Sequence, residues 1–141
     1  MKANRGGGDH AIVNLIANMW HGMPGMAHSG AARAGMLNFT ETAALEWAPV
    51  RSNAVAPGWI ASSGMDNYPP KMAPLIKQLP KMKPANRLGT ESEVSAAIVF
   101  LLSPAAAFIS GACLRVDGAA PNAKRQARMA GGRLWYCLSS L

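Results

Sequence analysis

The sequence contains very little cysteine: Cys113 and Cys137 are the only two among its 141 residues. Two cysteines so far apart make neither a zinc site nor a disulfide framework. The three histidines, His10, His21 and His28, lack metal-ligand spacing, so we expect no metal centre. The amino-terminal residues are glycine-rich and polar rather than an apolar secretory signal, which leaves the reducing cytoplasm as the expected compartment.

Acidic and aromatic residues are scarce as well. Seven Asp and Glu residues stand against fourteen Lys and Arg residues, for a net charge of +7, and aromatic residues make up 6% of the chain. The basic residues form two groups, at 71–87 and at 124–133. Such groups can bind nucleic acid or a phosphorylated small molecule. However, no aromatic residues are interleaved with them as in a nucleic-acid module, so we expect a solvated surface and no nucleic-acid partner.

Long hydrophobic runs are absent with one exception. Residues 94–114 carry no charge, and that length is sufficient to span a bilayer. Pro104 stands in the middle of this run, with serine and glycine residues on both sides. A buried helix, a turn and a buried strand explain the run better than a membrane span, so we expect no membrane partner.

Short apolar runs bounded by turn residues predict three buried strands, at 11–17, 51–56 and 112–116. Helical patterns separate them, at 28–48 and at 91–102. Alternation of strands and helices implies right-handed parallel crossovers and an α/β layer. Three strands are few for such a layer, because parallel strands need cover on both faces.

The ends of the predicted helices carry recognisable signals. Ser29 is the predicted N-cap of the first helix, and Pro49 ends it. Thr90 is the predicted N-cap of the second helix, where Glu93 completes a capping box. Residues 59–88 contain five prolines, which predicts an irregular substrate lid with at most short helices.

The order of these segments resembles the second half of a short-chain dehydrogenase/reductase. The most specific pieces are NAVAPGWI at 53–60 and the run from Arg87 to Gly118. HSGAARAG, at 28–35, further resembles the trans-2-enoyl-CoA reductases and the citronellol-type dehydrogenases. The resemblance implies that residues 1–120 are the carboxyl-terminal portion of such a domain and that residues 121–141 are a basic, poorly ordered tail.

The fold implied by the resemblance is a Rossmann-type, doubly wound parallel sheet, of which about three strands and two main helices are present. In the family, the amino-terminal half carries a Gly-x-x-x-Gly-x-Gly turn, where the pyrophosphate meets a helix N-terminus. These 141 residues contain no such turn, since the glycines at 6–8 neither follow a strand pattern nor precede a helical one. We therefore expect a truncated chain whose amino-terminal half is missing.

The catalytic pattern of the family is also altered. Most members place Tyr-x-x-x-Lys at the start of the long helix, where the Tyr moves the proton and the Lys holds the nicotinamide ribose. Ser29 and Arg33 occupy these positions here. Arg33 keeps the positive charge but does not titrate, and Ser29 cannot transfer a proton without an activating base. The serine that usually follows the preceding strand is replaced near Ile16 and Ala17, which leaves Tyr68 as the nearest alternative proton donor.

The cofactor contacts implied by the resemblance are better preserved. Pro57, Gly58 and Ile60 match the turn whose backbone contacts the nicotinamide amide, and Ser62 falls where a Thr usually contacts the diphosphate. Together with Arg33, these residues are the predicted contacts of NADP or NAD. Pro57 and Gly58 alone would be an ordinary turn, but in this context we favour the cofactor.

Two functions remain open. The first is an oxidoreductase by descent, which performs NADP(H)-dependent reduction of an enoyl-CoA or oxidation of a terpenoid alcohol and is not competent as a truncated chain. The second is a non-catalytic fragment or interaction subunit that pairs with an intact relative. Because the family's dimer interface uses the long helix, we also expect a homo-oligomer or association through residues 28–48.

Overall fold

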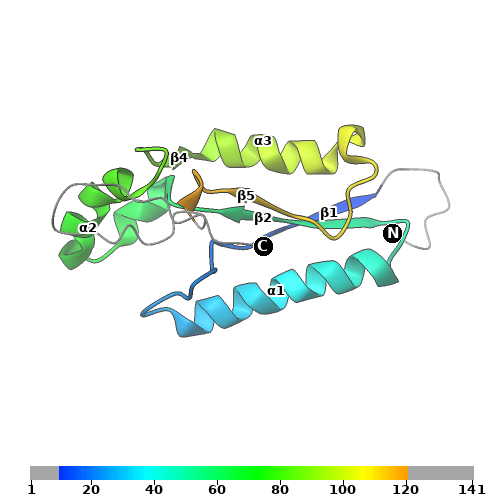
Figure 1. The fold of residues 1–141 in the computed structure, drawn as a ribbon, viewed down its shortest axis with the longest axis horizontal. Coiled ribbons are helices and arrows are strands. Elements are labelled where there is room, and N and C mark those ends of the chain that lie inside the picture. The colour runs from blue at the N-terminus through cyan, green and yellow to red at the C-terminus, as the bar shows by residue number, and fades with distance from the viewer. Residues whose placement is uncertain (1–9, 121–141) are drawn as a thin grey trace, which may run out of the picture.

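A parallel three-stranded sheet forms the centre of the molecule (Figure 1). The computed structural model describes residues 10–120. The strands are β1 (Ala11–Leu15), β2 (Arg51–Pro57) and β5 (Cys113–Val116). β2 lies between β1 and β5 and is parallel to both. The predicted strands and their parallel pairing are therefore confirmed, with ends that differ by one or two residues.

Two helices cover the opposite faces of this sheet. Figure 1 shows α1 (Ala27–Glu46) on one face and α3 (Glu91–Leu102) on the other. Each strand–helix–strand crossover therefore places its helix on a different side, as a doubly wound sheet requires. The predicted helices at 28–48 and 91–102 are confirmed to within two residues.

The predicted cap of α1 is wrong. The helix begins at Ala27 with Met26 as its N-cap, and no side chain caps it. The amide of Gly30 already donates to the carbonyl of Met26 at 3.0 Å. Ser29 therefore lies inside the first turn, too far along to accept a bond from a later free amide. The helix also ends at Glu46, three residues before Pro49.

The cap of α3 agrees with the sequence. The Thr90 hydroxyl accepts a bond from the Glu93 amide at 3.3 Å, and the Glu93 carboxylate accepts one from the Thr90 amide at 2.8 Å. Arg87 also donates to the Glu93 carboxylate through two nitrogens, at 2.9 and 2.6 Å. The capping box thus fixes the position where the lid passes into α3.

The segment at 59–88, which is predicted to be a substrate lid and is here called the lid, is built from short helical pieces, among which α2 (Ala73–Gln78) has six residues. It also contains a strand pair that the sequence did not predict: β3 (Ile60–Ala61) runs parallel to β4 (Gly89–Thr90). Two-residue strands are too short to show an alternating pattern. The pair ties the beginning of the lid to its end.

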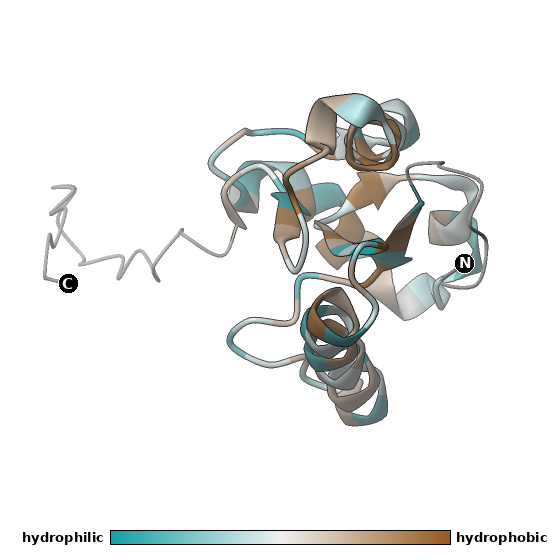
Figure 2. Cartoon of the chain, turned by 90° about the vertical axis from the view of Figure 1, so that its right-hand side faces the viewer, coloured by the Kyte–Doolittle hydropathy of each residue, from teal (hydrophilic) through white to brown (hydrophobic). Residues whose placement is uncertain are grey.

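The sheet has one apolar cluster on each face, and Figure 2 shows apolar residues concentrated on the strands between the two helices. Val55 packs with Val94 and Leu101 on the α3 side, whereas Ala54 and Ala56 pack on the α1 side. Successive residues of β2 therefore serve opposite faces, which explains why this strand reads as a continuous apolar run.

Two buried polar side chains of β2 hold the segment between α3 and β5. Arg51, only 4% exposed, donates to the carbonyls of Leu101 at 2.7 Å and Ala106 at 3.0 Å. Asn53 donates to the carbonyl of Ile109 at 2.8 Å and accepts a bond from the amide of Ala112, the residue before β5, at 3.0 Å. These bonds satisfy carbonyls that the end of a helix leaves free.

Both outer strands of the sheet have an open edge in the described residues, where β5 also pairs with β2 alone. Within residues 10–120, β1 pairs with β2 alone, and Leu15 at its end is 52% exposed. Several apolar side chains of α1, including Phe39 and Leu45, are also exposed. None of the helices in this part of the chain is long and apolar enough to cross a membrane.

Candidate functional site

All three strands end at the same side of the molecule, where α1 begins and the lid lies (Figure 1). In open α/β sheets, ligands bind outside the carboxyl ends of the strands. The loop between β1 and α1, the turn after β2 and the turn after β5 meet there. This end is therefore the candidate site, and the predicted site residues can be located with respect to it.

The turn after β2 is held tightly by its neighbours. The Gly58 amide donates to the carbonyl of Val116 at 2.9 Å, and the Asn18 amide donates to the carbonyl of Pro57 at 3.0 Å. A Cβ atom on Gly58 would lie 2.8 Å from the Cα of Asp117, a distance that real side chains do not reach. Glycine is therefore required here because the backbones approach closely.

A hollow of about 230 Å³, here called the turn cavity, opens beside this turn. Its lining includes Gly58, Trp59, Ile60, Ser62, Met65 and Tyr68. Three of the four residues predicted for the turn thus share one cavity, and Pro57 ends the strand next to them. The rings of Trp59 and Tyr68 lie 6.0 Å apart, so the predicted alternative proton donor borders the same cavity.

The turn cavity fits part of a dinucleotide rather than a whole one. Pockets for complete small molecules are usually about 300–1,000 Å³, and this one is smaller. Pyrophosphate binding needs a glycine-rich turn that opens a helix, and α1 begins without one, at Met26 and Ala27. The turn cavity is therefore too small for a whole dinucleotide, and α1 does not supply the turn that a pyrophosphate needs.

Arg33 and Ser29 lie at the same end of the molecule, on the first turns of α1. Arg33 is exposed and precedes Thr40 by seven residues, which places both on one side of the helix. Thr40 accepts a bond from the Asn14 side chain of β1 at 2.9 Å, so this side is turned toward the sheet. Neither Arg33 nor Ser29 lines the turn cavity, and no hydrogen bond within residues 10–120 joins Arg33 to it.

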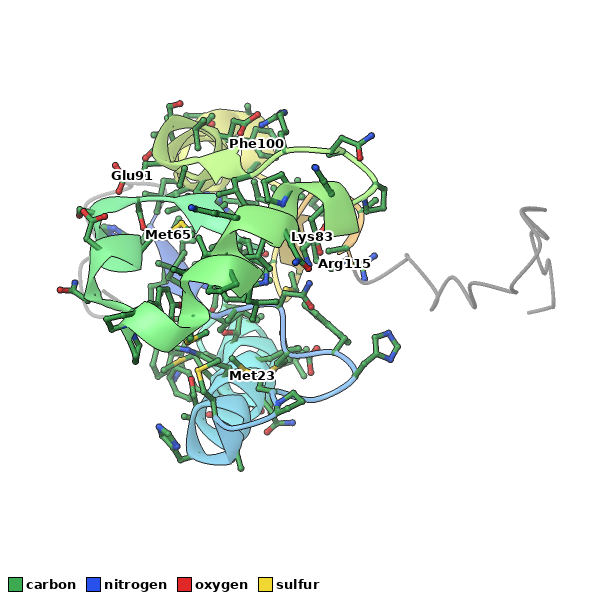
Figure 3. The ribbon with its side chains drawn as sticks, turned by 90° about the vertical axis from the view of Figure 1, so that its left-hand side faces the viewer. Met23, Met65, Lys83, Glu91, Phe100 and Arg115 are labelled. Atoms are coloured by element: carbon green, nitrogen blue, oxygen red, sulfur yellow. The ribbon has the colours of Figure 1, made fainter. Side chains whose placement is uncertain are left out.

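A larger hollow, of about 460 Å³ and here called the loop cavity, lies between the β1–α1 loop and the outer side of α1. Its lining includes Met19, Met23, Pro24, Gly30, Ala31 and Ala34. Figure 3 shows Met23 beside the start of α1, whereas Met65 belongs to the lid. The methionines of this loop are more typical of packing over the core than of an apolar pocket, yet Met19 and Met23 line this hollow.

Asp117 is a second feature that the sequence did not reveal, because Asp-Gly after a strand is typical of a turn. Its Oδ1 accepts a bond from the Ala119 amide at 3.0 Å. Its Oδ2 is buried without a hydrogen-bond partner in the described part of the chain. Because Asp117 contacts the Gly58 turn, this oxygen is a free acceptor at the edge of the candidate site.

Other titrating groups add little chemistry to this end of the molecule. Burial raises the pKa of the Cys113 thiol, so the thiol stays protonated and is a poor nucleophile. Within residues 10–120, no three His, Cys, Asp or Glu side chains are grouped to hold a metal ion.

Comparison with known proteins shows the relationships of the chain. The sequence pattern of a family described as enoyl-(acyl carrier protein) reductase matches residues 2–119. The peroxisomal 2,4-dienoyl-CoA reductase of Rattus norvegicus is 38% identical over 117 residues, which cover 78% of this chain and 39% of that protein.

Solved structures agree. The citronellol catabolism dehydrogenase of Pseudomonas aeruginosa is 56% identical with a TM-score of 0.65, over 80% of this chain and 43% of that one. The gluconate 5-dehydrogenase of Burkholderia cenocepacia, solved with NADP and tartrate, is 26% identical with a TM-score of 0.72, over 82% and 46% of the two chains. The chain thus spans less than half the length of each relative.

The family match covers most of the chain, and it agrees with the parallel α/β layer and with the close-packed turn after β2. The chain belongs to the short-chain dehydrogenase/reductase family of NAD(P)-dependent oxidoreductases, whose members include enoyl-CoA reductases and alcohol dehydrogenases.

Proposed function

We propose that these residues form the nicotinamide- and substrate-binding half of an NADP(H)-dependent oxidoreductase that reduces an enoyl-CoA or oxidises a terpenoid alcohol. The observation that carries the proposal is the turn cavity, where Gly58, Ile60 and Ser62 lie together at the carboxyl ends of the strands. The names of the relatives support the two substrate classes, because one reduces dienoyl-CoA and another belongs to citronellol catabolism.

The cofactor supplies hydride transfer, and the chain supplies position and charge. Gly58 and Ile60 offer backbone groups to the nicotinamide amide, and Ser62 offers its hydroxyl to the diphosphate. Arg33 binds the ribose hydroxyls through the N–H donors of its guanidinium. Lys77 and Lys81 of the lid are exposed and suit the phosphates of CoA or NADPH.

The proton step lacks the family's usual residue. Ser29 lies inside the first turn of α1, and no side chain is bonded to it as a base in residues 10–120. Tyr68 borders the turn cavity and carries a hydroxyl that donates or accepts a proton. We assign the proton transfer to Tyr68 in this function.

For this function, activity requires a glycine-rich half in addition to these residues, because they contain no pyrophosphate-binding turn. The test is to co-express the chain with the glycine-rich half of the Pseudomonas dehydrogenase and to follow NADPH with crotonyl-CoA or citronellol. We expect turnover by the complex, and at least a tenfold loss in the complex with Arg33→Ala. A stable complex with no turnover of either substrate would contradict the oxidoreductase function.

The second candidate is a non-catalytic interaction subunit. It is favoured by the replacement of the catalytic Tyr position with Ser29 and by the unpaired edge of β1. Under this function the same complex forms but neither substrate is turned over, and intact relatives bind the chain through α1 or β1. The co-expression experiment therefore separates the two candidates directly.

A further inference from the structure

The turn after β5 contacts two segments that are distant from it in the sequence. The Gly58 amide donates to the carbonyl of Val116 at 2.9 Å, and a Cβ atom placed on Gly58 would lie 2.8 Å from the Cα of Asp117. A Cβ atom placed on Gly118 would lie 3.0 Å from the Cβ of Ala85, near the end of the lid. The turn after β5 therefore lies between the turn after β2 and the end of the lid.

The end of the lid is itself held firmly. The Asn86 amide donates to the carbonyl of Lys83 at 2.9 Å and closes a tight turn around Ala85. The next residue, Arg87, donates to the Glu93 carboxylate through two nitrogens. A displacement of this part of the lid is therefore passed to the turn after β5 by direct contact, because closely packed groups transmit strain.

The turn after β5 has two features that cost stability. Ala119 has a φ angle of 65°, in the left-handed region that residues other than glycine rarely adopt. The Oδ1 atom of Asp117 accepts a bond from the Ala119 amide at 3.0 Å and holds this conformation. The Oδ2 atom of Asp117 is buried without a hydrogen-bond partner in the described part of the chain. Such costs are typical of places where the position of the backbone serves function.

We propose that the turn after β5 couples the end of the lid to the turn after β2, and that Asp117 is the positioning residue that keeps it rigid. The inference rests on the proposed function, in which the backbone of Gly58 and Ile60 contacts the nicotinamide amide. A substrate that displaces the lid then moves Ala85 against Gly118, and Asp117 passes this displacement to Gly58. The position of the nicotinamide thereby depends on the position of the lid.

The first test uses the purified full chain without cofactor, labelled with ¹⁵N, and follows hydrogen exchange of the Gly58 amide by NMR. Ala85→Gly removes the methyl group beside Gly118, and we expect the Gly58 amide to exchange about two- to fourfold faster. Ala73→Gly is the matched control, because it makes the same change at an exposed lid position away from Gly118 and should leave Gly58 unchanged. The amide of Val55, buried in β2, corrects for global unfolding.

Substitutions of Asp117 separate positioning from stability. Asp117→Asn keeps an oxygen for the Ala119 amide and should keep the effect of Ala85→Gly on Gly58. Asp117→Ala removes that oxygen and should reduce the effect by at least about half in a double-mutant cycle. Asp117→Ser makes the same bond more weakly and should give an intermediate value, which keeps the test sharp if Asp117→Ala fails to fold. If Asp117→Ala changes stability but leaves the effect of Ala85→Gly intact, the residue is merely structural and the inference is overturned.

The reconstituted complex with the glycine-rich half gives a second readout. Asp117→Ala should lower kcat about tenfold, since the nicotinamide is held less firmly, and change KM for NADPH by less than about twofold, since the glycine-rich half binds the rest of the cofactor. A higher KM with unchanged kcat would overturn the inference, as would equal Gly58 exchange in Ala85→Gly and the original chain. Coupled exchange in a chain whose complex turns over no substrate would leave the coupling assigned and remove only the oxidoreductase function.

Discussion

The Arg51 side chain is a charged group held at 4% exposure by backbone carbonyls. Its guanidinium donates to Leu101 and Ala106 and also to Ser103 at 3.3 Å. A charged donor bonded to buried carbonyls contributes more than a neutral one, and removing it leaves those carbonyls without partners. Arg51 thus connects β2 with the end of α3, and through it with the beginning of β5.

We predict that Arg51→Met lowers the free energy of unfolding by about 3 kcal/mol or more, because the lost bonds are charge-assisted and buried. Arg33→Met is the matched control, since the same change at an exposed position should alter stability by less than about 0.5 kcal/mol. Urea unfolding of the two variants measures both values. Equal stability of the two would show that the buried guanidinium has no structural role.

Glu93 gives a prediction about pH. The hydrogen bond from Arg87, followed by that from the Thr90 amide, lowers the pKa of Glu93 from 4.5 to about 2. A carboxyl group with a lowered pKa in the folded state stabilises the fold above its unfolded pKa and loses that contribution as the pH falls through the folded value. The stabilisation should therefore be complete above pH 4.5 and disappear between pH 4.5 and about 2.

The measurement compares the chain with Glu93→Gln, which keeps the shape but has no titrating group. Urea midpoints at neutral pH should be higher for the original chain, and the difference should shrink as the pH approaches about 2. Comparing two chains at each pH removes the effect of the other carboxyl groups. A difference that stays constant over this range would contradict the assigned pKa.

At the scale of elements, the turns after β2 and β5 approach each other closely because Gly58 has no side chain. The Cβ of Gly58→Ala would meet Asp117 at 2.8 Å, so the turns after β2 and β5 must separate. We expect this substitution to lower the free energy of unfolding by about 1–3 kcal/mol. It should also perturb Trp59 fluorescence, because Trp59 borders the displaced turn cavity.

Gly35→Ala is the control for this prediction. Nothing lies within 4 Å of a Cβ placed on Gly35, and the residue is inside α1. The same change there should raise the free energy of unfolding by about 0.5–1 kcal/mol, because alanine favours a helix more than glycine does. If both substitutions shift the urea midpoint in the same direction, steric contact at Gly58 is not the cause.

Features that depend on residues close together in the sequence were predictable, and features that depend on contacts between distant parts of the chain were not. The capping box joins Thr90 and Glu93, only three positions apart, and was found where its pattern indicated. Most of the bonds made by the Arg51 and Asn53 side chains join them to carbonyls more than fifty residues away in the sequence. No local sequence pattern reveals such contacts. The predicted N-cap at Ser29 was wrong because α1 begins earlier, with the bond from the Gly30 amide to the carbonyl of Met26.

The candidate site shows the same division. Gly58, Ile60 and Ser62 were predicted together from the resemblance, and they share one cavity because they are close in the sequence. Their contacts with a cofactor stay predictions. The role of Arg33 came from a resemblance and stays a prediction. The loop cavity was not predicted, because its walls come from a loop and from one side of a helix that has small residues all round. The predicted tail at 121–141 lies outside the described residues.

At the scale of the whole molecule, the sheet has two unpaired edges in residues 10–120, one of which is that of β1. The outer backbone groups of β1 have no strand beside them in residues 10–120, and Leu15 is 52% exposed. An unpaired, apolar edge favours pairing with another chain. We predict that the purified chain self-associates, and that Leu15→Lys reduces this association because a charged side chain disfavours edge pairing. Light scattering over a range of concentrations measures it, and a monomer throughout would contradict the prediction.

The central claim is that these residues hold the nicotinamide and substrate but cannot work without a glycine-rich half. The most direct test is to titrate the purified chain with NADPH, follow its fluorescence, and then assay the same sample with enoyl-CoA. The account predicts no turnover by the chain alone and no saturable binding of the strength that intact relatives show. Saturable NADPH binding together with turnover of enoyl-CoA by a monomer would contradict it.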